Sequence, residues 1–147
     1  MITRWEDLES AARTELVKAQ ESYPLCFHRF YDTKSANTLL PQQPADFQAC
    51  YLGKVCMLEL KFSQAHESLR NNFAGAVRVN QLASARVWTR AGARYTILFH
   101  SSLSGIVECW DGLYLAECKS KGVKLSLDQR RLYDSVEQAL AKEIGYA

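Results

Sequence analysis

Residues 44–63 read PADFQACYLGKVCMLELKFS. This stretch holds two apolar segments of strand-like composition, residues 45–52 and 54–62, and Gly53 separates them. Short apolar runs that meet at a glycine are typical of paired strands joined by a turn. The stretch therefore predicts two neighbouring strands of a sheet.

Three ionisable residues, Asp46, Glu59 and Lys61, stand inside these apolar strands. Because side chains alternate between the two faces of a strand, Glu59 and Lys61 share one face, whereas Leu58 and Leu60 fall on the core face. If the two strands pair across the turn, Asp46 reaches the same edge of the sheet. We therefore expect two carboxylates and a lysine to converge there.

This set of side chains suits a hard cation. Carboxylate oxygens bind Mg²⁺ or Mn²⁺, which keep several waters and also bind phosphate oxygens. Such a metal acidifies a water molecule and neutralises the charge of a phosphodiester, and a lysine beside it can orient that water. The alternative is a surface ion pair in which Lys61 only balances Glu59.

The rest of the chain alternates helical and strand patterns. The predicted elements, in chain order, are a helix over residues 3–22, a strand over 25–32, a loop over 33–44, the two strands at Gly53, a helix over 76–91, strands over 94–100 and 105–112, and a continuation of the sheet over 113–118. This order predicts an α/β fold with a mixed β-sheet flanked by helices, in a single domain over residues 1–147.

The last helix is expected to start at Ser126, because Ser126 and Gln129 have the spacing of a capping box. Asp111 and Gly112 have the composition of a hairpin turn. The apolar face of the last helix would consist of Leu132, Val136, Leu140 and Ile144.

The 147 residues carry a net charge of +2, and the five cysteines include no CxxC pair. We interpret the cysteines as buried apolar residues in a reducing compartment rather than as zinc ligands or disulfides. No apolar run approaches the length of a membrane span, and the opening residues MITRWEDLESAARTEL lack the basic start and apolar core of a signal peptide. We therefore expect a cytoplasmic protein with no membrane partner.

Charge is distributed unevenly along the chain. Residues 61–94 contain six basic side chains and one acidic one, a second basic group lies at residues 119–131, and the first 21 residues contain five acids. Segregated signs suit a protein that offers one face to a polyanion such as DNA. A solvated helix face is the alternative interpretation.

The pattern PADF…LELK, with twelve residues between Asp46 and Glu59, resembles the motif of the PD-(D/E)xK nucleases. The resemblance is closest to the RecU-like and related phage Holliday junction resolvases, which carry a glutamine on the helix after the Glu-x-Lys strand. Here VRVNQLASARVWTRAG supplies Gln81. The Arg29 and Asp32 of HRFYDT match an Arg-x-x-Asp element of these nucleases.

The resemblance implies a restriction-endonuclease-like core and an endonuclease that cleaves branched DNA with Mg²⁺ or Mn²⁺. It also implies a homodimer, because two opposed cuts need two active sites. Asp46, Glu59, the carbonyl of Leu60 and a glutamate of the first helix would hold the metal. Lys61 would position the attacking water, and Gln81 would orient Lys61 or the phosphate.

The first-helix glutamate is either Glu15 or Glu9, which flank the apolar stripe of that helix. Spacing in similar nucleases favours Glu15. The basic residues expected to contact the DNA backbone are Lys34, Arg78, Arg86 and Arg90.

Two alternatives stay open. The sequence lacks the stalk insertion of RecU proteins, so the substrate could be single-stranded, nicked or flap DNA instead of a junction. A non-catalytic module with the same fold that binds DNA or another protein is the second alternative. A bacterial cell and a phage-infected host are both compatible with the sequence.

Overall fold

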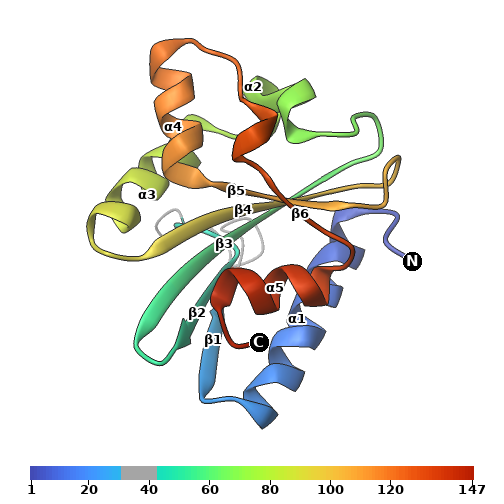
Figure 1. Ribbon diagram of the computed structural model, residues 1–147, viewed down its shortest axis with the longest axis vertical. Helices are drawn as coiled ribbons and strands as arrows, with labels where there is room; N and C mark the ends of the chain where they lie inside the picture. Colours follow the sequence, from blue (N-terminus) through green and yellow to red (C-terminus); the bar gives the residue numbers. More distant parts are fainter. Residues whose placement is uncertain (31–42) are drawn as a thin grey trace, which may run out of the picture.

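One six-stranded sheet organises the computed structural model, which describes residues 1–30 and 43–147 (Figure 1). The strands lie in chain order; β3 and β4 pair in parallel, and the other neighbours pair antiparallel. The strands are β1 (Leu25–Arg29), β2 (Phe47–Tyr51), β3 (Lys54–Ser63), β4 (Arg94–Ser101), β5 (Val107–Asp111) and β6 (Arg131–Tyr133). The helices are α1 (Trp5–Ser22), α2 (Phe73–Ala76), α3 (Val79–Arg90), α4 (Gly112–Lys121) and α5 (Val136–Ile144), with 3₁₀ turns η1 (Leu69–Asn72) and η2 (Leu127–Gln129). The predicted α/β fold with a mixed sheet flanked by helices is confirmed.

The two strands predicted around Gly53 form the hairpin of β2 and β3. They pair antiparallel, with Tyr51 opposite Lys54. Leu52 and Gly53 make the turn with φ values of 50° and 79°. Two consecutive positive values are those of the type I′ turn, whose twist matches that of the flanking strands. This register places the start of β2 beside the second half of β3.

β3 lies inside the sheet and is buried on both faces, so the described residues form two hydrophobic cores. Leu58 and Leu60 pack with α1 and α5. Met57 packs on the opposite face with η1, α3 and α4. Figure 1 shows α1 and α5 on one side of the sheet and α2, α3 and α4 on the other. Glu59 and Lys61 therefore project toward the α3 side, because they alternate with the leucines.

The connection from β3 to β4 runs over the α3 side of the sheet. A parallel pair needs such a crossover, and η1, α2 and α3 provide it. The helix predicted over residues 76–91 corresponds to α3, which starts at Val79 with Arg78 as its N-cap. The crossover thereby brings the first turn of α3 over β3.

The strand predicted over residues 113–118 is wrong, because these residues lie in α4. A short apolar run has no period that separates a buried strand from a buried helix. The expected hairpin turn is also wrong, since β5 ends at Asp111 and α4 begins at Gly112. A Cβ on Gly112 would lie 2.6 Å from Cδ1 of Tyr95, so this junction has no room for a larger residue.

The last helix starts later than predicted. α5 begins at Val136, and the hydroxyl of Ser135 accepts a hydrogen bond from the backbone N–H of Gln138 at 3.1 Å. Ser126 makes no side-chain cap and precedes only the turn η2. Leu132 lies in β6 instead of on the helix, so a strand separates the expected start of the helix from its real start.

The five cysteines are free thiols, and Cys56, Cys109 and Cys118 are buried as interpreted from the sequence. Cys26 is exposed on β1. Within residues 1–30 and 43–147, no helix has both the length and the apolar character needed to cross a membrane.

Candidate active site

Asp46 immediately precedes Phe47, the first residue of β2, at the end of the ladder that pairs β2 with β3. Its backbone N–H donates to the carbonyl of Leu58 at 3.0 Å, and its carboxylate Oδ2 accepts from the backbone N–H of Leu60 at 2.7 Å. The Asp46 carboxylate thus takes the place of the backbone carbonyl that would otherwise accept from the N–H of Leu60 in the β2–β3 ladder. Tyr95 holds the preceding segment, because its hydroxyl donates to the carbonyl of Pro44 at 2.6 Å.

Glu59 is the buried acid of the site, with 5% of its surface exposed. Its Oε1 accepts a hydrogen bond from Nε2 of Gln81. Its Oε2 is buried without a hydrogen-bond partner in the described part of the chain. Burial, together with the neighbouring Asp46, raises the pKa of Glu59 well above its usual value, and Lys61 opposes the rise only in part.

Gln81 is fixed at both ends of its amide. It is the third residue of α3, and its Oε1 accepts from the backbone N–H of Arg78 at 3.0 Å, as in a capping box. Its Nε2 then points to Glu59. The sequence indicated that Gln81 faces the site, but its capping role was not predicted.

Lys61 lies beside Glu59 on the same strand face. Its Nζ is 3.9 Å from Oε1 of Glu59, and 18% of its side chain is exposed. Burial lowers the pKa of Lys61, while the charges of Glu59 and Asp46 work in the opposite direction. The positive charge of Arg78, at the start of α3, adds to the lowering.

The structure does not bring Glu15 to this group. Glu15 lies on α1, which packs on the other face of the sheet, and its Oε2 accepts from the hydroxyl of Tyr146 at 2.7 Å. Glu9 lies nearer the N-terminal end of α1, and its Oε2 is 2.5 Å from NH2 of Arg29. Arg29 pairs in the sheet with Phe47, the residue after Asp46. Of the two helix acids, Glu9 is therefore the one directed toward the Asp46 edge.

The backbone of Leu60 contacts Asp46 on one side and Trp5 on the other. Its carbonyl accepts a hydrogen bond from Nε1 of Trp5 at 3.0 Å, and a carbonyl oxygen keeps a second lone pair. In residues 1–30 and 43–147, no group of three or more His, Cys, Asp or Glu side chains surrounds a possible metal position. The candidate metal ligands are thus Asp46, Glu59 and one carbonyl.

These ligands fit Mg²⁺ or Mn²⁺. Mg²⁺ binds through one or two carboxylates, substrate phosphate oxygens and waters rather than through a complete protein cage. The buried Oε2 of Glu59, which has no donor, is an oxygen that a cation would satisfy. The arrangement therefore fits a divalent cation with open positions for water and phosphate.

The predicted DNA contacts fall in different places. Arg78 and Arg90 are exposed at the two ends of α3. Arg86 is half-buried, and its NH2 donates to the carbonyl of Ala116 in α4 at 2.9 Å, so it joins the two helices. Lys34, and the Asp32 matched above, lie outside the described residues.

The helices on the two sides of the sheet differ in charge. Residues 69–90, which run from the start of η1 to the end of α3, contain four arginines and no acids. α1, on the other side, contains five acids and two basic residues. The side that carries Glu59 and Lys61 is thus the basic side.

No protein-family model matches this sequence. No curated protein matches it either. A solved structure with a similar arrangement is Hjc of Archaeoglobus fulgidus, a Holliday junction resolvase from an archaeal hyperthermophile, with a TM-score of 0.49 and 10% sequence identity over 90% of this chain and 92% of that one. The residues of the site, rather than this likeness, carry the functional interpretation.

Proposed function

We propose that the protein is a Mg²⁺- or Mn²⁺-dependent endonuclease of the PD-(D/E)xK type that cleaves phosphodiester bonds in DNA. The observation that carries the proposal is the buried Oε2 of Glu59, unpaired among the described residues, beside Asp46, Lys61 and Gln81. Two carboxylates, a lysine and a fixed amide match the chemistry of the sequence motif, side chain by side chain. The basic α3 side supplies the attraction for a polyanion.

Asp46, Glu59 and the carbonyl of Leu60 would hold the cation. When bound, the metal supplies a more acidic water and positive charge against the phosphodiester. Gln81 donates to Oε1 of Glu59 and so leaves Oε2 available as a ligand. Lys61 donates a hydrogen bond to the attacking water and stabilises the extra negative charge of the transition state.

For the substrate, we propose branched DNA, with a four-way junction as the first choice. Two opposed cuts would require a two-fold homodimer with one site per subunit. The protein would act in the cytoplasm of a bacterium or of a phage-infected host. Single-stranded, nicked or flap DNA is the alternative, and equal cleavage of junction and flap substrates would select it.

The test is cleavage of labelled junction, flap and linear duplex with and without Mg²⁺. We expect Lys61→Ala to lower the cleavage rate roughly a hundredfold, because a preorganised charge at the reacting phosphate is lost. Lys54→Ala removes the same charge from an exposed position at the other end of β3 and should cut like the parent. No Mg²⁺-dependent cleavage by the parent would reject the nuclease and leave a binding module.

The two helix acids can be separated by matched substitutions. We expect Glu9→Gln to lower the cleavage rate about tenfold or more, because Glu9 orders Arg29 next to the Asp46 edge. Glu15→Gln should keep the parent rate, since Glu15 contacts Tyr146 on the other face. The measurement is single-turnover cleavage at saturating Mg²⁺, and the reverse order of effects would restore Glu15 as the better candidate.

A further inference from the structure

A groove lies on the basic side of the sheet, away from Glu59. One wall is formed by residues 70–74 of η1 and α2, and the other by residues 122–125 after α4. Its volume is about 630 Å³. Arg70 stands on one wall and Lys124 on the other, and the described residues that line the groove include no acid. The groove therefore presents positive charge from both sides.

The groove is connected to the candidate active site through the crossover. Arg70 and Arg78 stand before and after α2, and Gln81 follows in the first turn of α3. The backbone N–H of Arg78 donates to Oε1 of Gln81 at 3.0 Å, and Nε2 of Gln81 donates to Glu59. The crossover thus carries one cation at the groove, Arg70, and another, Arg78, beside the residue that contacts Glu59.

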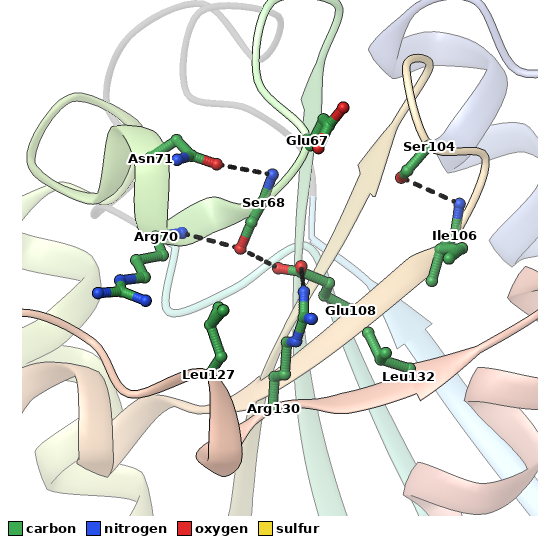
Figure 2. A pocket seen from close by; sticks show the side chains of 10 residues that line it. All are labelled: Glu67, Ser68, Arg70, Asn71, Ser104, Ile106, Glu108, Leu127, Arg130 and Leu132. Atoms are coloured by element: carbon green, nitrogen blue, oxygen red, sulfur yellow. Dashed lines mark hydrogen bonds and ion pairs between the residues drawn. The ribbon is translucent and has the colours of Figure 1, made fainter.

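The wall that carries Arg70 is held in place by a buried carboxylate. Glu108 on β5 is 2% exposed, and its Oε1 accepts from the hydroxyl of Ser68 at 3.0 Å and from the backbone N–H of Leu69 at 3.1 Å. Its Oε2 pairs with NH1 of Arg130 at 2.5 Å. Figure 2 shows Arg130 reaching Glu108, while the guanidinium of Arg70 points away from it. The guanidinium of Arg130 therefore neutralises Glu108 within the fold, whereas that of Arg70 does not pair with Glu108.

The opposite wall is also fixed. The backbone N–H of Val123 donates to the carbonyl of Cys118 at 3.1 Å, and the backbone N–H of Ser126 donates to the hydroxyl of Tyr114 at 2.8 Å. Leu125 is buried at 2% exposure between these anchors. Lys124 is exposed on the segment between these two hydrogen bonds.

We propose that this groove binds the phosphate backbone of a DNA arm, with Arg70 and Lys124 as its phosphate contacts. The inference rests on the proposed nuclease function and adds a second contact region to it. A backbone fits better than a free anion, because the two cations stand on opposite walls of an open groove, and Arg78 adds a further cation on the same crossover. The groove orients the DNA, and the cleavage chemistry stays at Glu59 and Lys61.

The test compares two double variants that each remove two positive charges. Arg70→Gln with Lys124→Gln neutralises the groove, and Lys54→Gln with Lys142→Gln neutralises two exposed lysines beyond it. Binding of a fluorescent four-way junction and of a linear duplex is measured by anisotropy in EDTA, across a salt series. For the groove variant we expect weaker binding and a salt dependence reduced by about 2 in logarithmic slope, one for each lost phosphate contact.

The control variant should bind like the parent, and both variants should keep the parent melting temperature, because all four side chains are exposed. Equal slopes for the groove and control variants would overturn the groove as a DNA site. If the parent cuts DNA while this comparison fails, only the groove is rejected. If the parent neither binds nor cuts DNA, the nuclease proposal fails as well.

Discussion

Replacing Glu59 with glutamine is expected to lower Mg²⁺-dependent cleavage roughly a thousandfold and, at the same time, to stabilise the fold by about 1 kcal/mol. Glutamine keeps the shape of the side chain and can still accept the hydrogen bond from Gln81. The stabilisation follows because glutamine is neutral beside Asp46, whereas the 5% exposed carboxyl of Glu59 must carry there either a desolvated charge or a proton taken up at the cost shown by its raised pKa. Loss of activity without loss of fold is the signature of a functional carboxylate.

Cleavage kinetics and thermal unfolding with and without Mg²⁺ check this result. Mg²⁺ should raise the melting temperature of the parent, since a ligand that binds the native state stabilises it, and should raise that of Glu59→Gln less. Glu67→Gln, at an exposed position on the same connection, is the matched control and should behave like the parent. A variant that cuts at the parent rate would remove Glu59 from the site.

The largest effect on stability is expected at Glu143, far from the proposed chemistry. Its side chain is 1% exposed and accepts from Nε and NH2 of Arg131, both at 2.7 Å, and from the hydroxyl of Tyr133 at 2.5 Å. Thr96 adds a hydrogen bond at 3.1 Å. Glu143→Ala removes the shared acceptor of these donors, although NH2 of Arg131 keeps Asp111 at 3.0 Å, and it should lower the free energy of unfolding by about 3 kcal/mol or more.

This contribution depends on pH with a defined sign. Burial works to raise the pKa of Glu143, but hydrogen bonds from Arg131 and Tyr133 and the charges of Arg131 and Arg94 outweigh it and leave the pKa lowered. A lowered pKa in the folded state gives stability that is present above the unfolded value and is lost as the pH falls through the folded value. The difference between the parent and Glu143→Ala in urea unfolding should therefore be full at pH 7 and shrink below about pH 4.5.

Glu137→Ala, an exposed acid on the same helix, is the control and should change the free energy of unfolding by less than about 1 kcal/mol. An equal effect of the two substitutions would contradict the network around Glu143.

The central part of the site could be predicted from the sequence because strand periodicity is local. Alternation alone placed Glu59 and Lys61 on one face, and the turn at Gly53 was enough to bring Asp46 alongside. The choice between Glu15 and Glu9 was different. A helical wheel shows which residues flank an apolar stripe, but it does not show which turn of α1 reaches Arg29 of β1, since that depends on packing between distant segments.

The C-terminal part shows the same limit. Ser126 and Ser135 are each followed three residues later by glutamine, so the two positions carry the same capping signal. Only Ser135 caps a helix, because Arg131 and Tyr133 must be extended in β6 to reach Glu143. The contact that decides between the two serines involves α5 itself, and no local pattern contains it.

The acids of α1 and the arginines of η1 and α3 lie on opposite sides of the sheet, and this affects how the protein approaches a polyanion. Opposite charges on the two sides of one sheet give the molecule a permanent dipole across its thickness, although its net charge is only +2. In the field of a polyanion such a dipole feels a torque, which turns the α3 side inward before contact is made. A molecule that approaches a polyanion with its α1 side forward would thereby be rotated before contact. Added salt shortens the distance over which this rotation acts.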